Sequence, residues 1–265
     1  IFNALPFKYW DLARWAWIQA FKISPVNFRR LLFVPKQHNA KGIGLLLNGY
    51  CNLYELSTKN DMIFGTKDEI LSKINDLSNL LEKLKNTNFS GSCWGYNFAW
   101  QARRLFFFPK ETPTGVATSF CVEALFKAFE ITKNKKYREL ALSSADFVMN
   151  DLNRTPHNSG FLFSYSPYVG NDTVYNASLL ATKILSLCYK YSKNDIFRET
   201  ALQAVRSVCD AQEKDGSWIY GLYTIQSWKD SFHTGYNLDA LITYQKCTGD
   251  NQFNEYIEKG FKYYI

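Results

Sequence analysis

The feature that most constrains the fold is a tandem repeat of paired helical segments. Apolar residues recur at helical spacing, and each pair of segments is divided by a short polar break such as Lys133–Lys135. The pairs are 118–129 with 137–152, 176–191 with 197–211, and 234–244 with a segment that opens at Phe253. A looser copy pairs 46–54 with 70–81 across Asn60 and Asp61. Such repeats are typical of architectures in which each unit buries its apolar face against its neighbours.

Two further signals recur with the pairs. An aromatic residue opens the second segment of each, at Tyr137, Phe197 and Phe253, with intervals of 60 and 56 residues. A glycine turn running into aromatics follows the second segment, and these loops are 91–96, 159–165 and 215–220. Helical hairpins joined by such loops predict an all-α chain. They either stack as an open solenoid or close into a ring of inner and outer helices.

The aromatic content is larger than a core needs. The chain has 265 residues, of which 46% are hydrophobic, and it contains 21 Phe, 17 Tyr and 7 Trp. Some of these rings should line a binding surface. We expect a single domain over residues 1–265 that includes an N-terminal helix near Trp10–Phe21. The start at Ile1, and an apolar pattern that runs to Ile265, leave open the interpretation that one or both ends are trimmed.

Charge and hydropathy limit the partners. The net charge of +7 is spread along the chain without a basic arm, which disfavours nucleic acid and favours an anionic small molecule or acidic glycan. No apolar run approaches the ~20 residues of a transmembrane helix. We therefore expect no transmembrane segment and a cytoplasmic location, with export left open by the trimmed-end interpretation. Nothing in the sequence indicates the oligomeric state.

The cysteines do not suggest a metal site. The six are dispersed, without a Cys-x-x-Cys pair or a Cys/His cluster. Cys121, Cys188 and Cys247 lie in helix-period apolar segments, where a thiol behaves as a small hydrophobe. We expect reduced core cysteines, no metal and no cofactor.

Two motifs carry a resemblance. Residues 94–101 (WGYNFAWQ) and 228–235 (WKDSFHTG) make the chain from Gly91 to Ile265 resemble the α/α toroid group. That group includes terpenoid cyclases, lanthionine cyclases, N-acylglucosamine epimerases, glycoside hydrolases and uronate lyases. The motifs are most similar to an uncharacterised bacterial set found with surface-polysaccharide biosynthesis, and also to the C-terminal domain of glucuronyl C5-epimerases. The resemblance implies an α/α toroid, with fewer hairpins than the six of a full ring.

The sequence lacks the catalytic motifs of several classes in this group. Terpene ionisation uses DDxxD or DxDD clusters, which this sequence lacks. Zinc-dependent members need convergent Cys and His ligands, and the only histidines are His38, His157 and His233. Carbohydrate chemistry fits better, because aromatic faces stack on the apolar faces of sugar rings. The expected partner is an oligosaccharide or polysaccharide, with an anionic one favoured.

The substrate-binding candidates combine aromatic, amide and cationic side chains. They are Trp94, Tyr96, Trp100, Gln101, Arg103, Arg104, Asn176, Trp218, Tyr220 and Trp228. Two arginines in sequence can clamp a carboxylate, phosphate or sulfate. The alternative interpretation is that Arg103 and Arg104 are solvated.

The catalytic candidates come from aligning the inner helices at Ser119, Asn176 and Thr234. This alignment places Tyr175 and His233 at one position, and Asp172 and Asp230 at another. The aspartates also suit ordinary helix caps. His233 is the best candidate for proton transfer, since an imidazole titrates near neutral pH and Asp230 can fix its tautomer.

Two mechanisms fit these residues. Glycoside hydrolysis would use Asp172 and Asp230 across a sugar. Uronate elimination or epimerisation would use Tyr165, Tyr175 or His233 as acid and base, with Asn176 and Arg103 neutralising the carboxylate. The positive charge and the epimerase resemblance favour the second. A non-catalytic glycan-binding or scaffold protein, and a terpenoid-type cyclase with degenerate motifs, are the alternatives.

Overall fold

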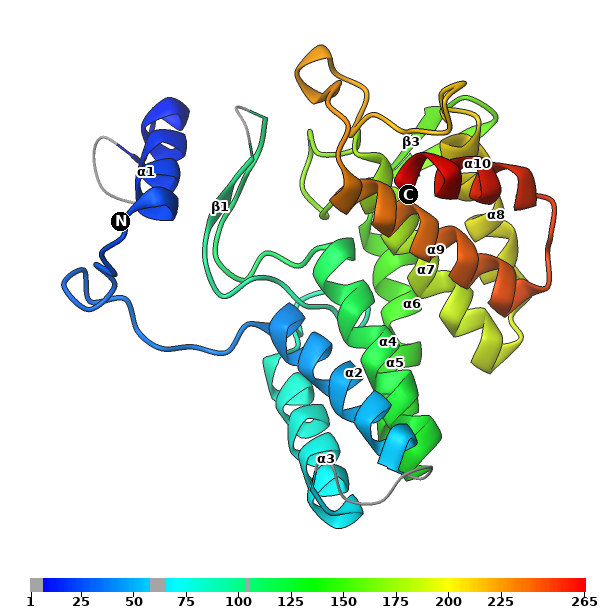
Figure 1. Ribbon diagram of the computed structural model, residues 1–265, viewed down its shortest axis with the longest axis horizontal. Coiled ribbons are helices and arrows are strands. Elements are labelled where there is room, and N and C mark those ends of the chain that lie inside the picture. Colours follow the sequence, from blue (N-terminus) through cyan, green and yellow to red (C-terminus); the bar gives the residue numbers. More distant parts are fainter. Residues whose placement is uncertain (1–6, 58–64, 103–104) are drawn as a thin grey trace.

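The computed structural model describes residues 7–57, 65–102 and 105–265 (Figure 1). These residues include four antiparallel helical hairpins, which confirms the predicted pairs; the expected break at Asn60 and Asp61 lies outside the described residues. The hairpins are α2 (Ala40–Ser57) with α3 (Lys67–Leu84); α4 (Gly115–Thr132) with α5 (Lys135–Leu142), α6 (Ser144–Asp146) and the π-helical turn η1 (Phe147–Asp151); α7 (Tyr175–Ser192) with α8 (Asp195–Cys209); and α9 (Ser231–Thr248) with α10 (Asn254–Tyr264).

The hairpins pack side by side with their first helices in one layer. Helix α4 lies between α2 and α7, and α9 packs on the other side of α7. The second helices, α3, α5 with η1, α8 and α10, form the outer layer (Figure 1). This confirms an all-α fold of the α/α toroid type. Because every first helix runs in the same direction, the N-terminal ends of the inner helices lie at one end of the layer.

The three predicted breaks that fall within the described residues, after α4, α7 and α9, are tight turns with a left-handed residue at the helix end. Lys133 and Lys193 adopt left-handed backbone at the ends of α4 and α7, and the asparagine that follows each caps the next helix. Gly249 takes the left-handed position at the end of α9, with φ of 77°. A residue in this conformation satisfies the last helical carbonyls and reverses the chain, so the outer helix folds back on the inner one.

The loop glycines are required by close approach between hairpins. A Cβ atom on Gly91, Gly160 or Gly216 would lie 1.9, 2.1 or 2.3 Å from a backbone oxygen of Ser143, Gln203 or Lys259, respectively. Each oxygen belongs to the outer layer of the following hairpin. The recurring glycine therefore lets each aromatic loop pass directly against the next repeat.

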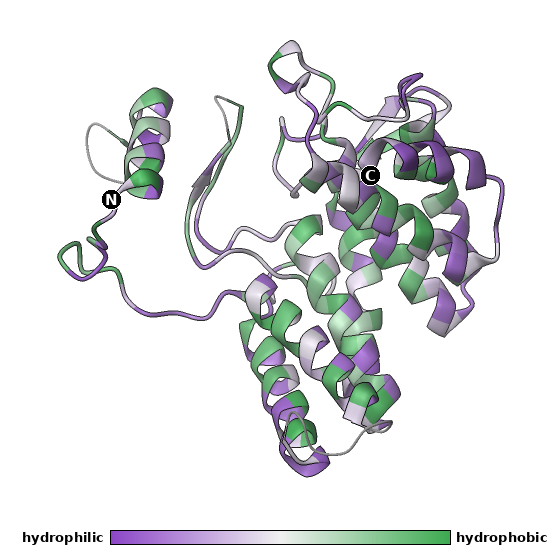
Figure 2. Cartoon of the chain, viewed as in Figure 1, coloured by the Kyte–Doolittle hydropathy of each residue, from purple (hydrophilic) through white to green (hydrophobic). Residues whose placement is uncertain are grey.

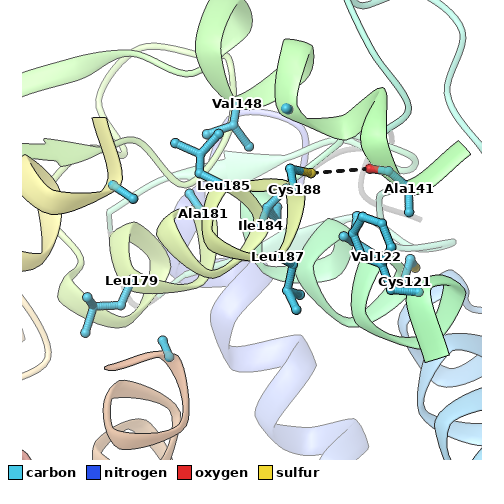
Figure 3. Packing of buried hydrophobic residues seen from close by; sticks show 14 of the residues in the cluster. Cys121, Val122, Ala141, Val148, Leu179, Ala181, Ile184, Leu185, Leu187 and Cys188 are labelled. Atoms are coloured by element: carbon cyan, nitrogen blue, oxygen red, sulfur yellow. Dashed lines mark hydrogen bonds between the residues drawn. The ribbon is translucent and has the colours of Figure 1, made fainter. Parts of the chain in front are cut away.

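The main core lies between the inner and outer layers. Figure 3 shows its packing around α7, where Cys188 Sγ lies 3.7 Å from the oxygen of Ala141. All six cysteines are free, and five of them are buried as expected of core thiols, whereas Cys247 is partly exposed. Burial raises the pKa of the Cys93 thiol to about 12, so that thiol stays protonated.

Two short antiparallel β-hairpins lie in the long loops between the helical hairpins. Strand β1 (Trp100–Gln101) pairs with β2 (Phe107–Phe108), and β3 (Arg154–His157) pairs with β4 (Gly160–Phe163). The short 3₁₀-helix η2 (Thr224–Gln226) lies in the loop before α9. None of the described helices is both long and apolar enough to cross a bilayer.

The expected N-terminal helix is α1 (Asp11–Ile23), and it stands away from the hairpins (Figure 1). It is joined to the β1–β2 hairpin through the Arg14 Nε atom, which donates to Gln101 Oε1 at 2.9 Å.

Candidate functional site

The aromatic loops bring their tyrosines to the N-terminal ends of the inner helices. The backbone amide of Gly115, at the start of α4, donates to the backbone carbonyl of Tyr165 at 3.0 Å. The backbone amide of Tyr175, at the start of α7, donates to the backbone carbonyl of Tyr220 at 3.2 Å. The rings gathered here, called the aromatic cluster below, are Tyr96, Trp100, Phe106, Phe108, Phe120, Tyr165, Tyr220, Trp228 and Tyr236.

Ring contacts connect most of this cluster. Trp100 lies 5.5 Å from Tyr165 and 6.4 Å from Tyr96, measured between centroids. Burial raises the pKa of Tyr96 to about 12, and burial together with nearby tyrosines raises the pKa of Tyr165 well above its usual value. Both hydroxyls therefore stay protonated at neutral pH. Because a raised pKa also makes them weak acids, the two hydroxyls are suited to donating hydrogen bonds rather than to transferring protons.

Asp230 and His233 form a hydrogen-bonded pair at the start of α9. Asp230 is the N-cap of this helix, and its Oδ1 atom accepts from the His233 amide at 2.7 Å. Its Oδ2 atom lies 2.7 Å from His233 Nδ1 and accepts from Trp228 Nε1 at 3.1 Å. Burial works against the charged carboxylate, but these hydrogen bonds outweigh it and lower the pKa of Asp230. An ionised Asp230 fixes the proton of His233 on Nδ1.

The second ring nitrogen of His233, Nε2, is not occupied by a hydrogen bond within the described residues. Among the described residues, Nε2 of His233 has no hydrogen-bond partner, and the side chain is 28% exposed. The Tyr220 ring lies edge-on to the imidazole at 4.6 Å and stacks on Trp228 at 4.4 Å. Phe232, which is 60% exposed, contacts the imidazole from another side. The partly exposed imidazole therefore lies beside the Tyr220 and Phe232 rings, and its Nε2 atom is not used by the fold.

Lys41, from the first turn of α2, reaches across the inner layer to α9. Its Nζ atom lies 3.2 Å from the Tyr236 hydroxyl and 4.4 Å above the Phe120 ring. Burial lowers the pKa of Lys41. Within the described residues, Lys41 forms no ion pair. A half-buried ammonium without a carboxylate partner thus lies among the rings of the cluster.

Lys183 of α7 shows the contrasting arrangement farther along the inner layer. Its fully buried ammonium binds Glu123 of α4 at 2.8 Å and Asp239 of α9 at 2.6 Å. Burial opposes its charge, and the two carboxylates outweigh burial and raise the pKa of Lys183. This ion triad ties three neighbouring inner helices together.

The helix starts correct the alignment made from the sequence. The N-caps are Thr114, Val174 and Asp230, so His233 corresponds to an alanine in α4 and in α7 rather than to Tyr175. Asp172 is not a helix cap: it lies two residues before Val174 and accepts a hydrogen bond from Thr155. The alignment failed because Val174 provides no side-chain cap, which made the nearby aspartate look like one.

Several predicted binding residues are structural in this fold. Trp94 and Trp218 are buried, and their indole nitrogens donate to the oxygens of Leu81 and Val208 in outer helices, so neither ring offers a face to a sugar. Gln101 is buried inside the β1–β2 hairpin, where it accepts from Arg14.

The remaining candidates fall into three groups. Tyr175 is buried in the main core beside His157, and burial raises its pKa. Asn176 is buried, and its Oδ1 atom has no hydrogen-bond partner in the structure. Tyr96, Trp100, Tyr165, Tyr220 and Trp228 belong to the aromatic cluster, while Arg103 and Arg104 lie outside the described residues.

Sequence reasoning missed Lys41, Phe120, Phe232 and Tyr236. Lys41 and Phe232 each lie in the first turn of an inner helix, and Phe120 and Tyr236 each lie six positions after an N-cap. A correct register would have placed these side chains on one face.

A cavity of about 340 Å³ lies beside the start of α2. It is lined by polar residues that include His38, Lys85, Asn86, Asn97 and Glu111. The described residues contain no cluster of three or more His, Cys, Asp or Glu side chains that could hold a metal ion.

Comparison with known proteins relates the fold to enzymes of carbohydrate metabolism. No family model matches the chain, and no curated protein matches it. Among solved structures it is similar to a D-mannose isomerase (16% identity, TM-score 0.58), a sugar epimerase from a ruminal bacterium (14%, 0.60) and a family 76 α-mannanase from Bacteroides thetaiotaomicron (13%, 0.62). Each match covers 85% of this chain but only 58 to 60% of the other. At this identity the likeness shows the fold alone.

Proposed function

We propose that the chain acts on a carbohydrate of bacterial surface-polysaccharide metabolism, by acid and base chemistry at His233 on an acidic, uronate-type glycan. The observation that carries this proposal is the Asp230–His233 pair, whose partly exposed imidazole contacts Tyr220 of the Trp228–Tyr220 stack and the exposed Phe232 ring. Enzymes named as sugar isomerases, sugar epimerases and mannanases share the fold and support the carbohydrate class.

The chemistry follows from the hydrogen bonds. With Nδ1 bound to ionised Asp230, His233 Nε2 is a neutral base, and the carboxylate stabilises the imidazolium that forms when it takes a proton. In a uronate the acidic hydrogen is on the carbon next to the carboxylate. Removing it and returning a proton to the opposite face inverts the centre, whereas loss of the neighbouring glycosidic oxygen gives elimination. Tyr96 and Tyr165 keep their protons and can donate hydrogen bonds within the aromatic cluster, and the proton returned to the opposite face would come from solvent water.

The acidic group of the substrate would be met by Lys41. This ammonium is held against Phe120 and Tyr236, with no carboxylate to neutralise it among the described residues. A bound substrate carboxylate would neutralise the Lys41 ammonium. The ammonium would in turn stabilise the negative charge that develops next to the carboxylate when the neighbouring carbon loses its proton.

Hydrolysis by Asp172 and Asp230 has less support. The Asp172 carboxylate is engaged by Thr155 of the β3–β4 hairpin. One similar structure is an inactive variant of an α-1,6-mannanase in which two adjacent aspartates are replaced, and this sequence has no two consecutive aspartates.

The test is turnover of acidic and neutral oligosaccharides by the purified chain. Ultraviolet absorbance detects elimination, deuterium uptake from D₂O detects epimerisation, and reducing ends detect hydrolysis. We expect elimination or exchange on the uronate substrates and a loss of about 10²-fold or more in His233→Gln. His38→Gln, which alters an exposed histidine, serves as the control and should keep full activity.

Three results would oppose the proposal. Reducing ends from neutral glycans would favour hydrolysis, saturable binding without product would favour the glycan-binding alternative, and unchanged turnover in His233→Gln would exclude the proposed base.

Lys41→Met should weaken binding of uronate oligosaccharides while leaving binding of neutral ones unchanged.

A further inference from the structure

Residues 7–36, called the N-terminal segment below, turn apolar side chains toward solvent. The buried residue of α1 is an arginine, Arg14, whereas Trp10 is 56% exposed and Ile23 is 80% exposed. The turn after the helix continues the pattern, with Leu31 at 72% and Phe33 at 91%. Only Arg14 of α1 is buried, so much of the apolar surface of this amphipathic helix is not covered by the rest of the fold.

This segment has few attachments to the rest of the chain. Arg14 donates to Gln101 and lies 4.6 Å above the Phe107 ring, which joins α1 to the β1–β2 hairpin. Figure 2 shows α1 clear of the helical hairpins, with apolar residues in view on the helix and on the turn that follows. Its apolar surface is thus available to a partner rather than buried in the fold.

The N-terminal segment carries an excess of positive charge, which indicates a negatively charged partner. Five exposed basic residues lie among the rings, without an ion pair to any described carboxylate: Lys8, Lys22, Arg29, Arg30 and Lys36. The single acidic residue, Asp11, is paired with Arg14. Three of the seven tryptophans of the chain lie in this segment, at Trp10, Trp15 and Trp17.

We propose that the N-terminal segment binds the surface of an anionic lipid bilayer. Tryptophan and tyrosine favour the headgroup region, where their apolar rings contact acyl chains, and lysine and arginine pair with lipid phosphates. A helix of 13 residues is too short to span a bilayer, so α1 would lie in the interface. A second copy of the segment would meet it with the same positive charge, which disfavours self-association.

Membrane attachment would also position the aromatic cluster. The β1–β2 hairpin that holds α1 contributes Trp100 and Phe108, which contact Tyr165. The lipid-bound segment and the candidate site are therefore joined through one short hairpin. The proposal itself does not depend on the proposed function, because it rests on residues outside that site.

The test is co-sedimentation of the whole chain with vesicles of phosphatidylcholine, or of an equimolar mixture with phosphatidylglycerol. We expect binding to the mixed vesicles that weakens as salt is raised. At about fivefold per basic residue, Arg29→Gln with Arg30→Gln should weaken partitioning about thirtyfold. Trp10→Ser with Trp15→Ser should weaken it about tenfold.

Matched controls separate the segment from general charge and apolarity. Lys135→Gln with Lys214→Gln removes the same charge elsewhere, and Val169→Ser with Ile196→Ser removes exposed apolar residues elsewhere; both should bind as the unaltered chain does. The proposal fails if the mixed vesicles do not sediment the chain, or if the controls lose as much binding as the segment variants. It also fails if the chain is a dimer that Trp10→Ser with Trp15→Ser dissociates.

Discussion

The close approach of the loop glycines to the following repeat can be tested by three matched Gly→Ala substitutions. At Gly91 a Cβ atom would lie 1.9 Å from the Ser143 oxygen and 2.9 Å from the Phe147 nitrogen, both backbone atoms. At Gly170 the backbone φ is 81°, but a Cβ atom would meet nothing within 4 Å. At Gly216 φ is 88° and the Lys259 oxygen lies 2.3 Å from the Cβ position.

The three sites separate crowding from backbone strain. Left-handed backbone costs a residue with a Cβ atom about 1–2 kcal/mol, and alanine recovers about 0.4–1 kcal/mol by restricting the unfolded chain. Gly170→Ala should therefore lower the free energy of unfolding by about 1 kcal/mol or less. Crowding that backbone must relieve costs about 3 kcal/mol, so Gly91→Ala should lose about 2 kcal/mol after the same recovery. Gly216→Ala combines both effects and should lose about 4 kcal/mol.

Urea unfolding followed by circular dichroism measures these differences, provided that the slope against denaturant stays constant. From most to least stable, the variants should follow the order Gly170→Ala, Gly91→Ala, Gly216→Ala. A Gly91→Ala chain as stable as the unaltered one would show that the loop does not pass against the outer layer as described.

Three further predictions concern charged groups and thiols. Glu123→Gln with Asp239→Asn should destabilise the chain by about 3–5 kcal/mol in urea unfolding, because it leaves the buried Lys183 ammonium unpaired, whereas Lys183→Met should cost much less. If the two variants cost the same, the triad is not the buried ion network described. The lowered pKa of Asp230 should add to the free energy of unfolding at neutral pH. This contribution should be lost as the pH falls below 3.8, the ordinary pKa of an aspartate, and through the lower pKa of the folded chain. In Asp230→Asn the free energy of unfolding should therefore fall less steeply with acid. In labelling of the native chain with a thiol reagent, Cys247 should react before the five buried cysteines, and equal rates for all six would contradict the packing.

The sequence predicted the helical hairpins because their signals are local. Apolar periodicity and a polar break define each pair, and the break residues Lys133 and Lys193 supply the left-handed turn. The glycine loops were also predicted, but not their reason, because the close contact is with backbone of the next repeat. Trp94 and Trp218 show the limit: an aromatic residue after a glycine has the same pattern whether its ring faces a ligand or an outer helix.

The candidate site was predicted in part. Asp230 and His233 are three residues apart at a helix start, so their pairing follows from local geometry. Lys41 was missed because its contact with Tyr236 joins residues 195 positions apart, and the sequence has no local signal for it. Asp172 was placed with Asp230 because residue type was used to align the helix starts, and Val174 at the true cap does not show that type.

The central claim is that the rings around His233 bind a sugar. The most direct measurement is the set of indole N–H signals in a two-dimensional ¹H–¹⁵N spectrum while a uronate oligosaccharide is added. We expect a saturable shift of the Trp228 signal, whose indole donates to Asp230, while the signals of buried Trp94 and Trp218 stay in place. A Trp228 signal that does not move while the sugar binds elsewhere would contradict it.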